Sequence, residues 1–335
     1  MFYPKPLKSG STIAVCAFSS GVDTPYQARL DLALETLDSK GFKLVLDPNL
    51  RKNSGFVSAS KEVRATQLMQ YLLDDTIDAI MPPWGGEFAM EILPHLDFSA
   101  LKHAKPKWII GFSDVSTLQV ALTTELHWAS MHTTNLMQFV PAQSDKTTNK
   151  FFQAITLNKK ESFVQIASEK YESKGVNIID NPGHPFNLDS TTHWKTLNLT
   201  EKGMSGRLIG GCLDILIMTL DTPYFNLPRF CEQYPEQGVL LYIENAELSP
   251  TTWLRVLLSL KYKGIFDQIN GLLIGRHTPN DTDSTLTFEM ALKQADISVP
   301  IIYDMDIGHL PPNLTVINGA FCEISKQLEL KQTLI

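Results

Sequence analysis

The sequence has few cysteines, and they lie far apart. Its four cysteines, Cys16, Cys212, Cys231 and Cys322, include no C-x-x-C pair of the kind that binds zinc. The sequence also lacks the run of about 18 apolar residues that a membrane-spanning helix needs. No long block of lysine and arginine is present, and the formal net charge is -7. These absences argue against a cysteine zinc site, a transmembrane protein and a nucleic-acid partner.

The start of the chain shows no secretion signal, because residues 1–8 lack a basic segment followed by an apolar one. We therefore expect a cytoplasmic protein rather than a disulfide-bonded secreted one. Apolar residues make up 43% of the sequence and charged residues 19%, as in ordinary globular proteins. A chain of 335 residues is long enough for two domains with large cores.

Predicted strands alternate with predicted helices in the first part of the chain. The segment 26–40, for example, carries leucines at helical spacing and is followed by Gly41. This alternation predicts an α/β fold with a parallel sheet. We expect strands over 12–18, 42–46, 77–81, 108–112 and 128–132, and helices over 26–40, 61–73 and 115–126.

The rest of the chain divides into a polar segment and a second α/β part. Residues 142–200 are polar and rich in turn signals, and Asn318-Gly319 is typical of a two-residue hairpin. We expect an N-terminal domain over 1–165, a linker or substrate-facing segment over 166–200, and a C-terminal domain over 201–335. The last has predicted strands over 238–244, 269–274 and 299–303, helices over 251–262 and 286–295, and short antiparallel strands over 314–317, 320–324 and 328–331.

Ser113 lies in a tight turn between a buried strand and a helix. Only Gly111–Asp114 separates the two, which places the serine at the carboxyl edge of the predicted sheet, where open α/β folds bind ligands. The N–H of Asp114 and the helix dipole would face a developing oxyanion there, as at a nucleophile elbow. Val115 breaks the G-x-S-x-G pattern. The local sequence therefore leaves two interpretations open, a nucleophile and a helix cap.

A glycine pair follows the third predicted strand. Gly85 and Gly86 let the backbone approach a ligand closely, and their N–H groups are candidate oxyanion donors. The alternative is a plain turn between that strand and a helix expected over 89–93. The spacing does not decide between these two interpretations.

A nucleophilic serine needs a base, and the base needs an orienting acid. His132 ends a predicted strand of the same sheet, while His277 and His309 each follow a strand of the second part. Glu244 closes an apolar run, and its burial at a strand end would cost free energy unless it is paired. Glu247 is a competing acid nearby, better explained as a carboxylate at a helix start. The spacing does not choose between His277 and His309.

Several segments, taken together and in order, resemble the LD-carboxypeptidase family of serine peptidases, which includes the microcin C immunity-type peptidases. The sequence departs from that family at Phe18, where proline is common, and at Cys212, where a G-G-N-L motif has asparagine. The resemblance covers most of the chain outside 142–200. The similar segments are 6–15, A-F-S-S at 17–20, W-G-G at 84–86 with 92–97, G-F-S-D at 111–114, G-G-C-L at 210–213, Y-I-E at 242–244, I-G-H-L-P-P-N-L at 307–314 and N-G-A at 318–320.

The resemblance implies a catalytic triad of Ser113, Glu244 and His309, so that the base left open by spacing is His309. It implies an oxyanion hole formed by backbone N–H groups of Gly86 and Asp114. It also implies a flavodoxin-like N-terminal domain, a smaller swivelling β/α C-terminal domain, a site between them, and a homodimer. The implied chemistry uses neither a metal nor a cofactor.

The implied reaction is amide hydrolysis through an acyl-enzyme, and the substrate is a small peptide conjugate of one of two kinds. An immunity-type peptidase cleaves a peptidyl- or aminoacyl-nucleotide, whereas an LD-carboxypeptidase removes the terminal D-amino acid of a muropeptide tetrapeptide. We favour the immunity-type branch, from the long middle segment and from L-I-G-R at 273–276. A non-catalytic α/β ligand-binding protein is the alternative of another class.

Five residues are candidate substrate contacts. Gly85 and Trp84 belong to the glycine loop, and Glu87 beside them suits a substrate amine. Trp194 suits stacking on a nucleobase, or else the sealing of a hydrophobic cluster. Arg255, on the helix after Glu244, suits a carboxylate or phosphate, or a neighbouring acid.

Overall fold

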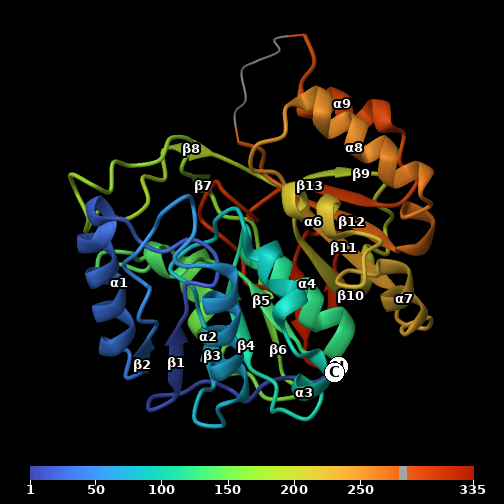
Figure 1. Cartoon of the computed structure of the whole chain (residues 1–335). Helices are drawn as coiled ribbons and strands as arrows, with labels where there is room; N and C mark the ends of the chain where they lie inside the picture. Colours follow the sequence, from blue (N-terminus) through green and yellow to red (C-terminus); the bar gives the residue numbers. More distant parts are fainter. Residues whose placement is uncertain (279–284) are drawn as a thin grey trace.

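The computed structural model describes residues 1–278 and 285–335, and two β-sheets organise them (Figure 1). The first sheet has the order β14-β5-β4-β3-β1-β2. Its strands are β1 (Thr12–Val15), β2 (Lys43–Leu46), β3 (Ala79–Ile80), β4 (Trp108–Gly111), β5 (Ser130–His132) and β14 (Val316–Asn318). Strands β1 to β5 run parallel in the order β2-β1-β3-β4-β5 of a flavodoxin-like sheet, which confirms the predicted α/β fold.

Helices connect the parallel strands of this sheet. Helix α2 starts after Ser60, whose hydroxyl accepts a hydrogen bond from the N–H of Val63. The helix expected over 89–93 is a 3-10 helix, Ala89–His95, and contains Pro94. The helices are α1 (Gln27–Ser39), α2 (Lys61–Leu73), α3 (Phe98–Leu101) and α4 (Val115–Leu126), with further 3-10 turns at Thr24–Tyr26 and Leu136–Gln138.

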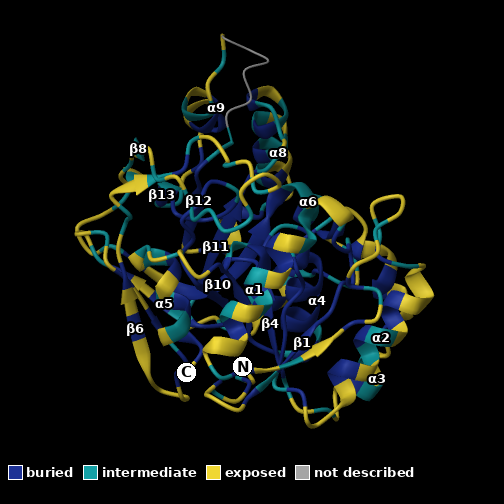
Figure 2. Cartoon of the chain, turned by 90° about the vertical axis from the view of Figure 1, so that its left-hand side faces the viewer, coloured by how far each residue is buried: buried dark blue, intermediate teal, exposed yellow. Residues whose placement is uncertain are grey.

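Helix α4 lies between the two sheets and is buried along its whole length except at Glu125 (Figure 2). It packs on β4 and β5 of the first sheet and on β10 of the second. The hydroxyl of Ser116 on this helix accepts a hydrogen bond of 3.0 Å from the N–H of Cys212, at the end of β10. Because almost no side of α4 faces water, its polar side chains are buried too and are hydrogen-bonded, as with Gln119 Nε2 to the carbonyl of Met131 (2.7 Å) and Thr123 Oγ1 to that of Trp128 (2.8 Å). The turn before α4 is therefore held against both sheets.

The second sheet is mixed and curled, with the order β6-β16-β15-β10-β11-β12-β13-β9. Its centre, β10 to β13, is parallel, and its edges are antiparallel. Helices α8 and α9 lie side by side over one face (Figure 1). The strands of this sheet are β6 (Ser162–Gln165), β9 (Lys195–Leu197), β10 (Met204–Cys212), β11 (Val239–Glu244), β12 (Gly271–Gly275), β13 (Ile301–Met305), β15 (Phe321–Ile324) and β16 (Leu330–Thr333). The helices in this part of the chain are α5 (Lys146–Ala154), α6 (Leu213–Thr219), α7 (Leu227–Glu232), α8 (Pro250–Tyr262) and α9 (Phe288–Ala295), with a 3-10 turn at Phe266–Gln268.

The polar middle segment is structured rather than a bare linker. Strands β6 and β9 form opposite edges of the second sheet, and β7 (Lys170–Tyr171) pairs with β8 (Ser190–Thr191) in a small ribbon. Between the ribbon strands, the chain returns to α1, where the guanidinium of Arg29 donates to the carbonyls of Pro182 (2.9 Å) and His184 (2.6 Å). The segment thus bridges the second sheet and the first.

The predicted hairpin at Asn318-Gly319 is wrong, because its two strands join different sheets. Strand β14 pairs with β5 in the first sheet, while β15 pairs with β10 and β16 in the second. The side chain of Asn318 fixes this crossing: its Oδ1 accepts from the N–H of Gly210 (3.0 Å) and the hydroxyl of Tyr242 (2.9 Å), and its Nδ2 donates to Ser130 Oγ (3.1 Å). Local turn chemistry was identified correctly, but tertiary hydrogen bonds determine where the flanking strands pair.

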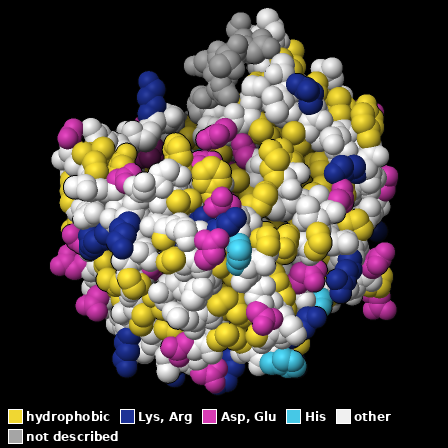
Figure 3. Space-filling view, viewed as in Figure 1, with side chains coloured by type: hydrophobic (Ala, Val, Ile, Leu, Met, Phe, Trp, Pro, Cys, Tyr) yellow, Lys and Arg dark blue, Asp and Glu magenta, His cyan; other side chains and the backbone are white. Residues whose placement is uncertain are grey.

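No helix within residues 1–278 and 285–335 is long and apolar enough to cross a membrane. On the face shown in Figure 3, the described basic, acidic and apolar side chains are interspersed.

Candidate active site

Ser113 occupies a strained turn between β4 and α4. Its φ is +65°, in the left-handed region that residues with a Cβ seldom adopt, and such strain is a frequent mark of a functional site. The glycine loop packs directly on it: a Cβ at Gly85 would lie 2.8 Å from Ser113 Cβ and 2.9 Å from the N of Asp114. Only glycine permits this approach, so the two motifs that the sequence singled out form one surface.

His309 links Ser113 to Glu244. Its Nε2 lies 3.1 Å from Ser113 Oγ, and its Nδ1 lies 2.8 Å from Glu244 Oε2. Glu244 ends β11 and is fully buried, whereas His309 lies in the loop that precedes β14. Gly308 brings the loop close, because its φ is +107° and a Cβ there would collide with the carboxylate of Glu244. Three segments far apart in the chain thus meet in one hydrogen-bonded row.

Mutual attraction outweighs the cost of burying this pair. Burial raises the pKa of Glu244, but the charge and hydrogen bond of His309 lower it, and the net shift is downward. Burial lowers the pKa of His309, but Glu244 raises it, with help from Asp214 and Glu247, and the net shift is upward. The pair therefore favours a carboxylate beside an imidazolium, which makes His309 a stronger base toward Ser113.

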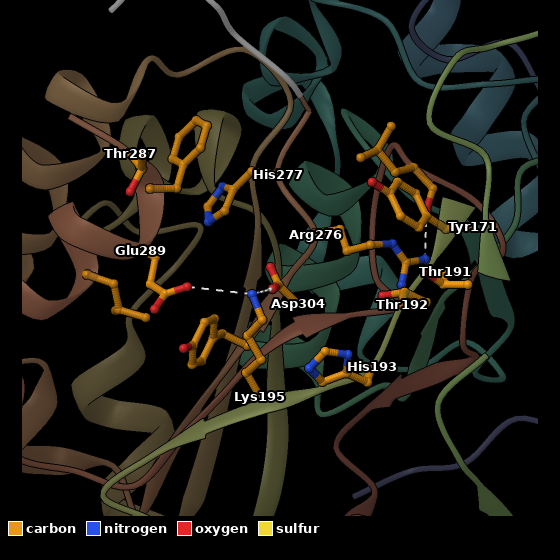
Figure 4. A pocket seen from close by; sticks show the side chains of 14 residues that line it. Tyr171, Thr191, Thr192, His193, Lys195, Arg276, His277, Thr287, Glu289 and Asp304 are labelled. Atoms are coloured by element: carbon orange, nitrogen blue, oxygen red, sulfur yellow. Dashed lines mark hydrogen bonds and ion pairs between the residues drawn. The ribbon is translucent and has the colours of Figure 1, made fainter. Parts of the chain in front are cut away.

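His277, the alternative base, faces elsewhere. Its ring stacks on Phe288 (centroids 3.9 Å apart) and meets the edge of Trp253 (4.5 Å), and burial lowers its pKa to about 3. It lines a second cavity of about 370 Å³, in which Figure 4 shows Lys195 between Glu289 and Asp304. The structure thus brings His309, and not His277, to Ser113.

Asp114 ties the nucleophile turn to the glycine loop through its side chain. Its carboxylate is 1% exposed and accepts hydrogen bonds from Ser19 Oγ (2.5 Å), the N–H of Ala89 (2.8 Å) and Thr117 Oγ1 (3.1 Å). Ala89 follows the glycine pair, so these bonds fix the loop's position relative to Ser113.

A cavity of about 580 Å³ opens beside Ser113 and His309. Its wall combines the first part of the chain with the middle segment. Aromatic rings contribute much of it, and Trp84 meets Tyr26 edge to face with centroids 5.3 Å apart. Lining residues are Ser20, Asp23, Tyr26, Arg29, Asn53, Trp84, Gly85, Gly86, Phe112, Ser113, Asn135, Met137, Gln138, Glu172, Gly175, Val176, Ile178, Phe186 and His309.

Two family models match the chain. Residues 13–133 match the LD-carboxypeptidase N-terminal domain, and residues 205–324 match the LD-carboxypeptidase C-terminal domain. The chain belongs to the LD-carboxypeptidase family. The family is one of peptidases, so the chain is an enzyme of a carboxypeptidase family.

Relatives of this LD-carboxypeptidase family member carry different names. The "Microcin C7 self-immunity protein MccF" of Escherichia coli is 26% identical over 93% of this chain and 89% of its own length. The "Probable murein peptide carboxypeptidase" of Bacillus subtilis is also 26% identical, over 95% and 90%. The solved structure of MccF in complex with aspartyl sulfamoyl adenosine has a TM-score of 0.87, with 24% identity and 98% of both chains covered. This last likeness shows that the fold is shared.

The expected substrate contacts of this family member divide into two groups. Trp84, Gly85 and Gly86 line the cavity beside Ser113. Glu87 lies outside this lining. Its side chain is largely exposed, but the loss of water around its carboxyl group, together with repulsion from Glu247, Asp114 and Asp214, raises its pKa. No metal-binding group of three or more His, Cys, Asp or Glu side chains occurs among the described residues.

Two other expected contacts lie away from this cavity. Trp194 is 3% exposed, and its Nε1–H donates to Asp306 Oδ2 (2.8 Å) within the core of the second sheet, so the stacking role expected for it is wrong. Its alternative, a tryptophan that seals a hydrophobic cluster, fits this position. Arg255 is exposed on α8, whose buried side carries Trp253 and Leu257, and it lies outside the cavity lining.

Sequence reasoning missed Arg29 and Glu172, which form a buried charged part of the cavity wall. Arg29 is 2% exposed, and its Nε–H also donates to the carbonyl of Met137 (2.7 Å). Burial lowers the pKa of Arg29 to about 10, while the nearby Glu172 raises it. A usable signal existed, because Arg29 shares a helix face with the buried Ala33 and Leu37, where a charge needs a partner.

Arg29→Ala should loosen the cavity wall formed by the middle segment. The change leaves three carbonyls, the buried one of Met137 and the half-buried ones of Pro182 and His184, without this donor, so we expect a loss of about 1–3 kcal/mol in the free energy of unfolding. We also expect KM to rise more than kcat falls. Thermal melting and steady-state kinetics measure both effects. The matched control is Arg51→Ala, which removes an exposed ion pair with Asp31 and should change stability by less than about 1 kcal/mol. Equal melting temperatures for the two variants would contradict this role.

Proposed function

We propose that this member of the LD-carboxypeptidase family is a serine peptidase with a triad of Ser113, His309 and Glu244. The observation that supports this most strongly is the hydrogen-bonded row from Glu244 through His309 to Ser113. The strained φ of Ser113 and its contact with Gly85 add to it. A helix cap alone would explain none of these distant contacts.

The geometry supports a two-step hydrolysis. Ser113 Oγ attacks the amide carbonyl carbon, and His309 Nε2 takes the hydroxyl proton. The carbonyl oxygen becomes an oxyanion, which the N–H groups of Gly86 and Asp114 stabilise. The C–N bond then breaks, and His309 gives its proton to the leaving amine.

Water completes the cycle in the second step. It attacks the ester carbon of the acyl-enzyme while His309 takes one of its protons, and collapse of the intermediate returns that proton to Ser113 and frees the carboxylic acid. Glu244 orients His309 and stabilises its protonated form in both steps.

Within this function, we propose a peptidyl- or aminoacyl-nucleotide substrate. The cavity beside Ser113 has a wall rich in aromatic rings, contributed by Tyr26, Trp84, Phe112 and Phe186. Base–aromatic stacking is worth about 1–3 kcal/mol per base. Two relatives of the same fold were solved with nucleotide ligands, MccF with aspartyl sulfamoyl adenosine and an MccF-like protein from Streptococcus pneumoniae with AMP.

Trp84→Leu should weaken the binding of a nucleotide substrate. If the indole stacks on the base, KM should rise about 5- to 150-fold, which corresponds to about 1–3 kcal/mol, with a smaller change in kcat. The control is Trp194→Phe, which removes the hydrogen bond to Asp306 in the core and should change stability but not KM. Equal KM values for Trp84→Leu and the wild type would exclude stacking on Trp84.

Removal of the terminal D-amino acid of a muropeptide is the second candidate. The buried charge of Arg29 in the cavity wall favours a substrate with a free carboxylate, and the Bacillus subtilis relative is named for murein peptides. A side-by-side assay decides between the two: one arm offers a tetrapeptide ending in D-alanine, and the other an aminoacyl sulfamoyl-adenosine. Cleavage of the tetrapeptide alone would reject the nucleotide branch.

A fluorophosphonate probe tests the catalytic proposal independently of the substrate. It should modify Ser113 of the wild type and leave Ser113→Ala unmodified, as mass spectrometry of peptides would show. A non-catalytic ligand-binding protein would not react. The homodimer remains a prediction, for which light scattering gives the mass in solution.

A further inference from the structure

Only one oxygen of the Glu244 carboxylate has a nitrogen or hydroxyl donor among the described residues. Its Oε2 accepts from His309, while its Oε1 is buried and has no hydrogen-bond partner among the described residues. Glu244 as a whole is 0% exposed. A buried carboxylate oxygen without a donor costs about 1–3 kcal/mol or more, and such groups in native proteins are nearly always satisfied. A donor for Oε1 is therefore expected close by.

His132, at the end of β5, has a buried ring nitrogen that also lacks a hydrogen-bond partner among the described residues. Its ring is 1% exposed, and its Nε2 is buried without a partner among the described residues. The ring packs edge to face on that of Tyr242, with centroids 5.3 Å apart, and its centroid lies 6.0 Å from that of Phe112. Tyr242 lies two residues before Glu244 on β11, so both side chains project from the same face of the strand. Phe112 in turn contacts the ring of His309 at 4.9 Å.

We propose that His132 is a positioning residue of the triad, whose Nε2–H serves Oε1 of Glu244 through one internal water. The inference rests on the proposed function and deepens it. His132 does not touch Ser113 or the substrate, and it acts by holding the carboxylate that holds His309.

Neutral histidine is well suited to this position. Burial lowers the pKa of His132 to about 4, with the positive charge of His309 adding to the effect and Glu244 opposing it. The ring therefore stays uncharged at neutral pH, and in the tautomer that carries its single proton on Nε2 it donates without placing a second cation beside the imidazolium that forms during catalysis. A lysine or arginine donor would oppose protonation of His309.

The other titratable groups around this carboxylate are poorer donors. The hydroxyl of Tyr242 already donates to Asn318. Cys212 lies opposite Glu244 in the strand register, and its thiol hydrogen-bonds the Glu244 side chain as well as Asp214 (3.6 Å), but a thiol is a weak donor. Glu247 and Asp214 are acids that act on His309 and supply no donor side chain at neutral pH.

Loss of the His132 donor should shift the acid limb of the pH–activity profile in one predictable direction. Without it, the ionised form of Glu244 is less stable, so the coupled pair takes up its first proton at a higher pH. The acid limb of activity should therefore move to higher pH. A purely structural defect would lower activity at all pH values without moving the limb.

The test compares His132→Gln with His132→Asn in the full-length enzyme. A glutamine amide nitrogen reaches the position of Nε2, whereas the shorter asparagine amide reaches only that of Nδ1. The readout is the rate at which a fluorophosphonate labels Ser113 as a function of pH, which needs no knowledge of the substrate. We expect His132→Gln to stay within about 3-fold of the wild type, and His132→Asn to lose 10-fold or more at neutral pH, on the basis of about 1–3 kcal/mol for the unserved oxygen. The acid limb of His132→Asn should lie at a higher pH.

The outcomes separate this inference from the proposed function. Equal rates and equal acid limbs for the two variants, with the wild type labelled normally, would overturn the role of His132 alone. Absence of labelling in the wild type would overturn the nucleophile and this inference together. Circular dichroism checks that both variants fold, and if His132→Asn does not, His132→Phe supplies a ring without a donor and carries the same expectation.

Discussion

Ser113→Ala should lower kcat/KM by about 10⁴- to 10⁶-fold, the range found when a triad nucleophile is removed. The loss follows because no other group can form the acyl-enzyme, and what remains is binding and the oxyanion donors. The measurement is steady-state hydrolysis of whichever substrate the side-by-side assay identifies. Activity within 10-fold of the wild type would remove Ser113 from the mechanism.

A second variant separates chemistry from folding at the same position. Ser113 holds a φ of +65°, which alanine tolerates poorly and glycine readily. Ser113→Gly and Ser113→Ala should therefore be equally inactive, but the glycine variant should be the more stable by up to about 1 kcal/mol. If Ser113→Gly and Ser113→Ala melt at the same temperature, the positive φ at position 113 does not destabilise the alanine variant.

Glu244→Gln should lower kcat by about 10³- to 10⁴-fold, because the amide can neither fix the tautomer of His309 nor stabilise its positive charge. The pH profile gives a second readout. In the wild type the pKa of His309 lies above the ordinary 6.5, so activity rises with pH through a value higher than that. Removing the charge of Glu244 takes away the largest upward contribution and leaves burial, so the acid limb should move to lower pH.

The matched control for this change is Glu247→Gln, on the exposed loop that follows β11. Glu247 also raises the pKa of His309, but as a smaller contribution than Glu244. We expect kcat within about 3-fold of the wild type and a slight shift of the acid limb in the same direction, since exposed charges are screened by solvent. Comparable losses of kcat in both variants would mean that the total negative charge near His309 matters, and not the hydrogen bond from Glu244 to His309.

The sequence predicted the elements of the first sheet well, because each strand and helix carries its own periodic apolar pattern. It predicted strand partners less well. Residues 314–317 and 320–324 had the local signal of a hairpin, yet the bonds of Asn318 to Gly210 and Tyr242 send them to different sheets. Such pairings depend on contacts about 100 residues away in the chain, for which a local pattern holds no information.

Prediction of the site residues from the sequence met the same limit. Spacing alone left His277 and His309 open, and only the resemblance distinguished them before the structure placed His309 against Ser113. Arg29 and Glu172 were missed because their charges are buried by a polar segment that has no periodicity. For Trp194 the sequence left open both stacking on a nucleobase and the sealing of a hydrophobic cluster, and its indole lies in the core of the second sheet.

Strand β14 completes the first sheet from a distant part of the chain. The edge of β5 is covered by residues 316–318, whereas β1 to β5 all lie within residues 12–132. Without β14, β5 is an open edge of the kind that pairs with other chains. A fragment ending near residue 165 would thus expose this edge while already containing the turn at Ser113, and the long-range pairing with β14 both protects the edge and makes completion of the first sheet depend on the C-terminal part of the chain.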